Sequence, residues 1–364
     1  MKMKNKWVAA TAVLLAAAAS AQAQTSNVTL AGVADAAGRY VSNEGRGSVK
    51  SLVSGSNSTS KIIIRGTEDL GGGLSAGFHL EHGLQLDSGT QVVATQFWDR
   101  RATVMLASRS LGEIRAGRDY VLNYVNWNRY DPFAYVGAGG ANNFINATPT
   151  GPIKSAFGTG LNTTVRSSDS VEYLLPAGIG GLEGGVMLSA GEGGTTATGQ
   201  NKYTGLRLGY TSGGFNISGT ASRTENNLTA ASGGHAFTDR VIAGSYDFHF
   251  MQVSLALRQF KQLTAKQTNT LVGVWIPLGQ GTVKLSLNRA NLAGKVGAAS
   301  IDANDAQQFA VGYVYDLSKR SALYTTASFI DNKGAATFVV PGGAAGLAGG
   351  GTSKGFEVGM RHNF

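Results

Sequence analysis

The chain has 364 residues, including 52 glycines, six prolines and no cysteine, and its formal net charge is +9. The absence of cysteine excludes a fold stapled by disulfide bonds. The basic residues are scattered singly along the chain rather than gathered in a basic run, which argues against nucleic acid as a partner.

The first 23 residues have the three parts of a secretory signal peptide. Lys2, Lys4 and Lys6 form a positive n-region, residues 7–19 form an apolar segment, and residues 21–23 (AQA) form a small-residue cleavage site. The apolar segment is shorter than the roughly 20 residues that span a bilayer as a helix. We therefore expect a signal peptide at 1–23 and a mature chain of 24–364 that begins at Gln24, with its charge reduced to +6 by loss of the three lysines.

After the signal peptide, no apolar run approaches the roughly 18 residues that a membrane-spanning helix needs. Sixteen segments instead favour β-strands, because apolar and polar residues alternate along them with period two. In residues 283–288, for example, three apolar residues share one face and three polar residues share the other. The expected strands are residues 27–42, 59–68, 74–86, 98–108, 112–118, 168–175, 181–190, 202–210, 215–223, 238–246, 251–261, 269–276, 282–291, 306–315, 321–331 and 354–364.

The connections between these segments alternate between short and long. The short ones lie at 68–73, 108–112, 176–180, 211–214, 247–250, 277–281 and 316–320, and the long ones at 43–58, 87–97, 119–167, 191–201, 224–237, 262–268, 292–305 and 332–353. An up-and-down meander places alternate turns at opposite ends, so one end carries tight turns and the other long loops. Outer-membrane barrels have this asymmetry.

The third long connection, residues 119–167, shows no sustained alternation and contains three of the six prolines. A loop of this length inside a compact domain is uncommon unless it has a function. We therefore expect it to fold into the mouth of the barrel and narrow the channel.

The last nine residues, FEVGMRHNF, alternate and end on an aromatic residue. Phe356, Val358 and Phe364 are expected to point outward, and Glu357 and Arg361 inward. A terminal aromatic fits the girdle at a membrane interface.

These patterns predict an all-β protein, a 16-stranded antiparallel transmembrane β-barrel with a long inward-folded third external loop. A secreted β-sandwich, β-helix or adhesin would show Greek-key irregularity or a repeat of fixed length. The sequence shows neither.

Six stretches carry a resemblance to a known family: NVTLAGVADA (27–36), SKIIIRGTEDLGGGLSAGFHLE (60–81), GEIRAGRDY (112–120), YDPF (130–133), YDLSKRSALY (315–324) and VGMRHNF (358–364). They extend from the first strand to the last and resemble the general Gram-negative porins of the β-proteobacterial type. The resemblance implies a homotrimer of sixteen-stranded barrels in the outer membrane, each with a third external loop folded into the channel. The chain departs from the family pattern at Lys61, where arginine is usual, and at Ile63, where glycine is common. Its third loop also has few acidic residues.

Parity along the strands identifies the side chains that should face the lumen. Because Ile62 and Ile64 are expected to point outward, their neighbours Lys61 and Arg65 should point inward. The same rule places Arg101 and Thr103 inward, and puts Asp35 and Arg39 on the polar face of the first strand. The residues expected at the constriction are therefore Arg39, Lys61, Arg65 and Arg101 on the wall, with Arg129, Asp131 and Arg166 from the loop.

These charges predict a channel that prefers anions. Positive residues on one wall, opposed by loop residues such as Asp131, would create a transverse field in a narrow, low-dielectric channel. We expect an outer-membrane porin that forms a water-filled diffusion channel for small hydrophilic solutes and anions. Its other expected partners are the outer-membrane lipid and two further copies of itself.

Two other functions remain as alternatives. One is a substrate-specific channel with a saturable site for an organic acid or similar solute, in which Trp127, Tyr130, Phe133 and Tyr135 would stack on a ring. The other is an enzyme, for which His79 and Glu81 share a polar face. No G-x-S-x-G, H-E-x-x-H or metal-ligand spacing accompanies them, so we expect no enzyme, cofactor or metal.

Overall fold

The computed structural model describes residues 26–145, 151–158, 162–191, 201–225 and 235–364. The expected signal peptide, residues 1–23, and its boundary at Gln24 lie outside the described residues.

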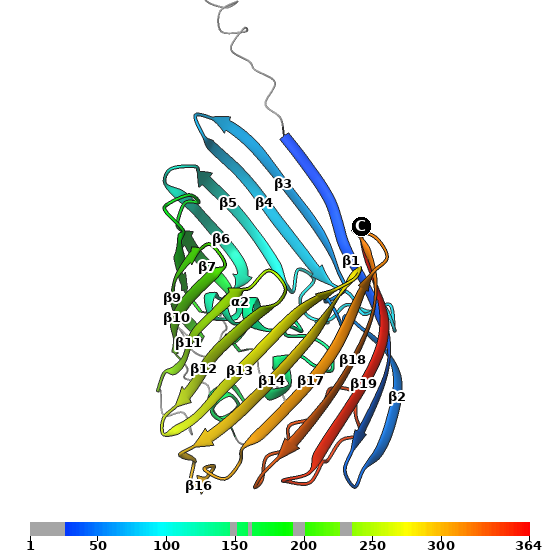
Figure 1. Ribbon diagram of the computed structural model, residues 1–364. Helices are drawn as coiled ribbons and strands as arrows, with labels where there is room; N and C mark the ends of the chain where they lie inside the picture. The colour runs from blue at the N-terminus through cyan, green and yellow to red at the C-terminus, as the bar shows by residue number, and fades with distance from the viewer. Residues whose placement is uncertain (1–25, 146–150, 159–161, 192–200, 226–234) are drawn as a thin grey trace, which may run out of the picture.

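Within the described residues, one antiparallel sheet of seventeen strands closes into a barrel whose strands run obliquely to its long axis (Figure 1). Its strands are β1 (Ser26–Asn43), β2 (Gly47–Ser54), β3 (Lys61–Gly71), β4 (Leu74–Gly83), β5 (Arg101–Ser108), β6 (Gly112–Tyr120), β7 (Arg166–Leu174), β8 (Leu182–Ser189), β9 (Lys202–Ser212), β10 (Phe215–Glu225), β11 (Phe237–Asp247), β12 (Gln252–Gln262), β13 (Ala265–Leu278), β14 (Gly281–Ala293), β17 (Ala306–Asp316), β18 (Ser321–Asn332) and β19 (Thr352–Asn363). A small separate hairpin consists of β15 (Lys295–Val296) and β16 (Ala299–Ser300).

Strand β1 closes the barrel. Residues 33–43 of β1 pair with β19, and residues 26–33 pair with β3. Residues 36–43 also pair with β2, which the sequence analysis did not anticipate. Strand β2 continues the first hairpin beside β1, so the other strands of the main sheet correspond to the sixteen that the alternation predicts.

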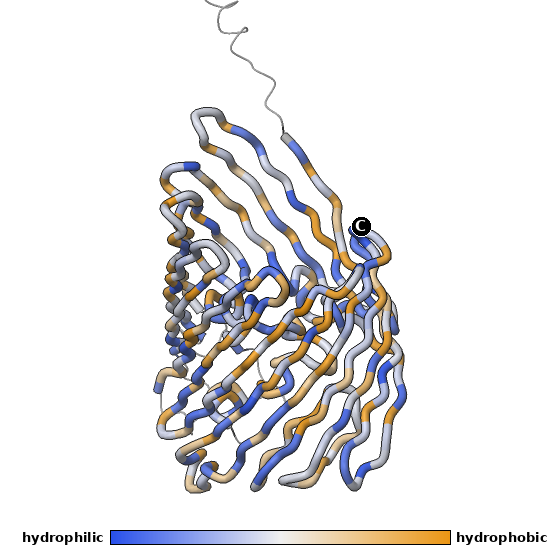
Figure 2. Tube along the Cα trace, viewed as in Figure 1, coloured by the Kyte–Doolittle hydropathy of each residue, from blue (hydrophilic) through white to orange (hydrophobic). Residues whose placement is uncertain are grey.

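The two faces of the wall differ as the alternation requires. Outward side chains such as Val104 and Leu206 are exposed, whereas inward side chains such as Ser218 and Asn288 are polar and buried. Figure 2 shows this as hydrophobic and hydrophilic residues that alternate along the strands. An apolar exterior and a polar interior are typical of a barrel in lipid.

The C-terminal strand follows the expected parity. Phe356, Val358 and Phe364 are exposed on the outer surface, while Glu357 is 1% exposed on the inner one. The ring of Phe364 lies over Gly32, where an added Cβ would come within 2.3 Å of the ring. Because Gly32 has no side chain, the ring of Phe364 can pack against the backbone of β1 where β1 pairs with β19.

The ends of the barrel confirm the alternation of short and long connections, with two exceptions. The expected long connection 43–58 contains β2 (Gly47–Ser54), which three residues join to β1. Strands β3 and β4 are joined by two residues, whereas β4 and β5 are joined by residues 84–100. The expected long loop at 262–268 is wrong, because β12 ends at Gln262 and β13 begins at Ala265. No helix in the described part of the chain is long and apolar enough to cross a bilayer.

The third long connection contains regular structure that the sequence analysis missed. It holds α2 (Leu122–Tyr130), η1 (Ala141–Phe144) and α3 (Pro152–Phe157). Helix α2 has no capping side chain at Val121, and its buried residues mix Asn123 and Asn126 with apolar ones. Such a helix has no apolar stripe and depends on its surroundings for stability.

Candidate functional site in the lumen

The third loop lies against lumen-facing side chains of the barrel. The amide of Asn123 donates to the carbonyl of Asp239 on β11 at 2.7 Å, and the hydroxyl of Ser254 on β12 donates to the carbonyl of Tyr130 at 2.7 Å. The hydroxyl of Tyr130 is 2.6 Å from that of Ser218 on β10. These contacts hold α2 against β10 to β12.

The loop then continues along the inner surface toward the end of the chain. The amide of Ala138 donates to Glu357 on β19 at 3.2 Å, and Asn143 donates to Gln308 on β17 at 3.0 Å. One residue further along the loop, the carbonyl of Phe144 accepts from the side-chain amide of Gln267 on β13 at 2.7 Å. The described loop residues thus contact the inner wall from β8 to β19.

Four loop aromatics anchor the loop to the wall. Trp127, Tyr130, Phe133 and Tyr135 are between 0% and 5% exposed. Trp127, Tyr130 and Tyr135 belong to one buried cluster with Phe237 and Phe260 of the wall. The idea that these four rings stack on a solute is therefore wrong, because their faces are already covered by protein.

Asp131 organises the loop rather than facing the basic wall. It is 3% exposed, and its two oxygens accept backbone N–H bonds from Phe133, Tyr135 and Ala141 at 2.9–3.0 Å. Burial raises the pKa of Asp131, against the opposing effect of those three N–H donors and of Lys284. The expectation that Asp131 presents an exposed negative charge to the channel is corrected accordingly.

The opposite wall carries a charged network around Glu81. The carboxylate of Glu81 contacts Arg100 at 2.5 Å and Lys61 at 3.2 Å, and accepts from the hydroxyl of Tyr120 at 2.9 Å. Lys61 keeps 21% of its side chain exposed, whereas Arg100 keeps 8%. Lys61 is therefore the more accessible cation of the two.

A second network surrounds Asp119. Its carboxylate contacts Arg101 at 2.6 Å and Arg115 at 2.9 Å. Arg115 also contacts Glu113 at 2.8 Å and Glu172 at 3.4 Å. The side chains of Arg101 and Arg115 remain about one-fifth exposed, so both cations reach the lumen.

The ring of Tyr120 joins the two networks. The guanidinium of Arg166 lies 4.8 Å from the ring centroid, and those of Arg101 and Arg100 lie at 5.4 and 5.8 Å. Cation–π attraction of this kind holds like charges near one another and stabilises each of them. Tyr124 of α2 stacks on Tyr120 with ring centroids 5.1 Å apart, which ties the loop to the basic wall.

The structure brings four of the seven predicted constriction residues together. Lys61, Arg101 and Arg166 lie in these networks, and Arg65 is exposed on the same wall beside His79. Arg39 lies apart from them.

Arg39 is buried and fully engaged. It contacts Glu357 at 2.9 Å and donates to Ser56 at 2.7 Å and to the carbonyl of Pro341 at 3.2 Å. Arg129 is also separate, because it pairs with Glu183 on β8. Asp35, expected as a wall anion, is 0% exposed and accepts the amides of residues 56–58.

Parity could have identified part of what the sequence analysis missed. Glu113 and Arg115 alternate with Ile114 and Ala116 on β6, so the rule used for Lys61 would have placed both inward. Arg100 lies outside a strand, and Tyr120 follows a β-bulge between Gly117 and Asp119. Parity does not hold at either position.

We define the basic wall as six cations and four carboxylates that face the lumen together. The cations are Lys61, Arg65, Arg100, Arg101, Arg115 and Arg166, and the carboxylates are Glu81, Glu113, Asp119 and Glu172. The basic wall therefore carries a net positive charge beside the loop.

Among the described residues, no group of His, Asp and Glu is arranged to hold a metal ion. His79 contacts only Glu81 in the ion-pair network, at 3.6 Å.

Comparisons with known proteins agree with this architecture. The family model described as Gram-negative porin matches residues 10–335. The chain is 35% identical to outer membrane porin protein 32 of Delftia acidovorans, over 96% of this chain and 97% of that protein. It is 28% identical to an outer membrane porin protein of Bordetella pertussis, over 90% and 94% of the two chains.

The solved structure of an anion-selective porin from Comamonas acidovorans superimposes with a TM-score of 0.79. It is 32% identical and covers 93% of this chain and 100% of its own. The OmpT outer membrane protein of Vibrio cholerae, in its trimer form, shares the fold at a TM-score of 0.62 and 13% identity, with 93% and 99% covered. With its closed barrel and its match to the family model, the chain belongs to the Gram-negative porin family.

Proposed function

We propose that this outer-membrane porin passes small anions, including organic acids, in preference to cations. The observation that carries the proposal is the excess of cations on the basic wall, where six positive side chains face four carboxylates. The related Comamonas protein, described as anion-selective, supports the same direction.

The size of the electrostatic effect favours selectivity. At an effective dielectric constant near 20, two unit charges 4 Å apart interact by about 4 kcal/mol. Water in the lumen reduces this, but low-dielectric walls concentrate the field in the channel. Two uncompensated positive charges are therefore expected to favour anions several-fold.

The loop is proposed to supply the narrowing that brings solutes close to the basic wall. Its hydrogen bonds to inner-wall residues of β11 and β19 support this proposal, as does the stacking of Tyr124 on Tyr120. A solute crossing the channel would pass between the loop and Lys61, Arg101 and Arg115.

A substrate-specific channel has less support. The four aromatics proposed for ring stacking are buried against the wall. A general diffusion channel needs no such site.

The test is the reversal potential of the purified protein in a planar bilayer under a KCl gradient. The variant Lys61→Gln with Arg101→Gln removes two of the accessible cations of the basic wall and is expected to move the reversal potential toward cation selectivity. Lys319→Gln with Arg320→Gln removes the same charge from an exposed turn and should leave the reversal potential unchanged. Equal reversal potentials for the wild type and the lumen variant would contradict the proposal.

A further inference from the structure

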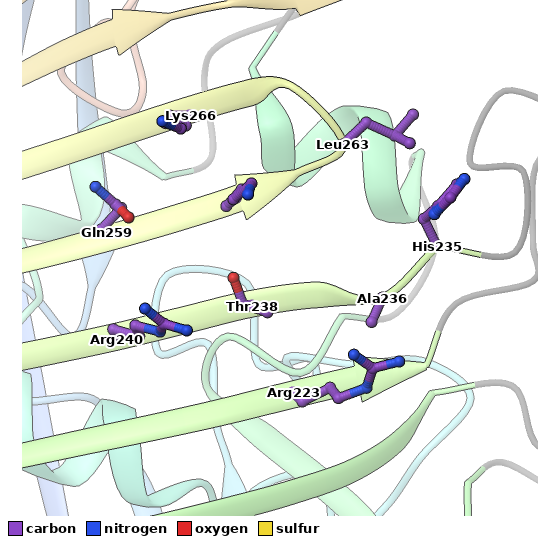
Figure 3. Close-up of a pocket in the computed structure, with 9 residues that line it drawn as sticks. Arg223, His235, Ala236, Thr238, Arg240, Gln259, Leu263 and Lys266 are labelled. Atoms are coloured by element: carbon purple, nitrogen blue, oxygen red, sulfur yellow. The ribbon is translucent and has the colours of Figure 1, made fainter.

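A buried ion pair lies between the barrel wall and the third loop. The guanidinium of Arg258 on β12 donates two N–H bonds to the carboxylate of Asp239 on β11, at 3.0 and 2.7 Å. The two side chains are 0% and 3% exposed. Their strand neighbours Arg240 and Gln259 line a hollow on the other face of the sheet (Figure 3). The ion pair therefore points inward, where protein covers it and shields it from permeating ions.

The ion pair holds the third loop near both of its ends. The side-chain amide of Asn123 donates to the backbone carbonyl of Asp239 at 2.7 Å. The backbone carbonyl of Thr164 accepts from Arg258 at 2.9 Å. Asn123 and Thr164 lie within three positions of β6 and β7, the strands that carry the loop. One ion pair on β11 and β12 thus contacts both limbs of a loop that belongs to other strands.

The same ion pair adjoins the aromatic residues that anchor the loop. The guanidinium carbon of Arg258 lies 4.6 Å from the ring centroid of Phe260. Phe260 belongs to the buried cluster that contains Trp127 of α2 and Tyr135. Because α2 has no capping side chain at its start, its position depends on contacts of this kind with the wall.

The chemistry of the pair suits positioning better than stabilisation. A buried arginine–carboxylate pair contributes little net stability, because both groups lose their hydration. Its two parallel bonds instead fix the direction of the guanidinium. The Nη2 atom of Arg258 is shared between Asp239 and the carbonyl of Thr164. The direction of the guanidinium therefore sets the position of the loop backbone.

We propose that Arg258 and Asp239 are positioning residues of the channel, which fix both ends of the third loop and thereby set the width of the lumen. This inference rests on the proposed narrowing of the channel by the loop. Unlike the basic wall, whose cations Arg101 and Arg115 are about one-fifth exposed, the buried pair offers no accessible charge. It acts on permeation only through the loop.

The test is the double variant Arg258→Gln with Asp239→Asn. It leaves the net charge unchanged and no buried charge unpaired, and the shorter glutamine loses the bond to the carbonyl of Thr164. Hydrogen exchange of the α2 amides, measured by mass spectrometry in detergent, should become at least about tenfold faster, because a lost bond to a charged group shifts local opening by that factor or more. Exchange in β17 and β18 should not change, and single-channel conductance in symmetric salt should rise.

Arg223→Gln with Glu225→Gln is the matched control. It removes an exposed ion pair, with N and O atoms 3.6 Å apart, from β10 without changing the net charge. Exchange of α2 and conductance should both equal those of the wild type.

A disulfide bond supplies a rescue. The hydroxyls of Thr163 in the loop and Thr224 on β10 are 2.6 Å apart, and the chain has no cysteine of its own. Thr163→Cys with Thr224→Cys therefore places two thiols within bonding reach. When oxidised, this bond should restore wild-type exchange and conductance to the double variant, and its reduction should remove the rescue.

Asn123→Ala, which leaves the ion pair intact, carries the test if the double variant does not fold, and it should also accelerate exchange in α2. Wild-type exchange in α2 of these variants would overturn the proposal. Faster exchange with wild-type conductance would overturn the claim that the pair sets the width of the lumen, and would show that the fault lies in the proposed narrowing by the loop.

Discussion

Individual carboxylates determine which positive charges of the basic wall remain available to a passing ion. Glu81 is 4% exposed and contacts Lys61, Arg100 and Tyr120. Alternation predicts correctly that Lys61 and Arg101 point inward. It does not reveal that Arg39 pairs with Glu357, which is distant in sequence, or that Asp131 accepts hydrogen bonds from loop amides, which depends on how the loop folds.

Replacing Glu81 by Gln should make the channel more anion-selective. The Gln carbonyl still accepts from Arg100, but the change removes a negative charge beside Lys61. Loss of the charge-assisted bonds should lower the free energy of unfolding by about 1–3 kcal/mol. Reversal potentials and thermal unfolding of the variant measure both effects.

The exposed Asp87, changed to Asn, is the matched control for charge and should alter neither quantity. A Glu81→Gln channel with wild-type selectivity would show that this network does not act on permeating ions.

At the scale of elements, the strands were predictable and the loop structure was not. The segment expected at 202–210 is Lys202–Ser212, since its apolar side chains must alternate to face lipid. Strand β2 was missed because its residues are half exposed on both faces. Helix α2 was missed because wall contacts, rather than its own sequence pattern, stabilise it.

Asp131→Ala should loosen the third loop and raise single-channel conductance. The substitution leaves the amides of Phe133, Tyr135 and Ala141 without their acceptor, and each buried unpaired amide costs about 1–3 kcal/mol. Single-channel recording in symmetric salt measures the change.

Asp302→Ala is the matched control, because Asp302 likewise accepts from the amide of Gly294, at 2.6 Å, in another long loop. Its conductance should equal that of the wild type. If the Asp131→Ala variant also has the single-channel conductance of the wild type, the loop does not narrow the channel.

At the scale of the whole molecule, the meander and its closure follow from the sequence alone. Period-two alternation predicts the strands, and the alternation of short and long connections predicts that one end of the barrel carries tight turns and the other long loops. The pairing of β2 beside β1 and the two-residue turn after Gln262 did not follow, because alternation does not set how far a hairpin extends beyond the membrane.

The mature chain is expected to begin at Gln24 and to assemble as a homotrimer, as the resemblance to the general Gram-negative porins implies. Native mass spectrometry in mild detergent should give three chains, each lacking residues 1–23. A monomer, or chains that retain those residues, would contradict this expectation.

The most direct test of the account is the wild-type reversal potential under a tenfold KCl gradient, measured at low and at high mean concentration. The basic wall predicts anion selectivity that is strong at low salt and weaker near 1 M, where the screening length falls from about 10 Å at 0.1 M to about 3 Å. Cation selectivity at low salt, or a reversal potential near zero there, would contradict the claim that the basic wall controls permeation.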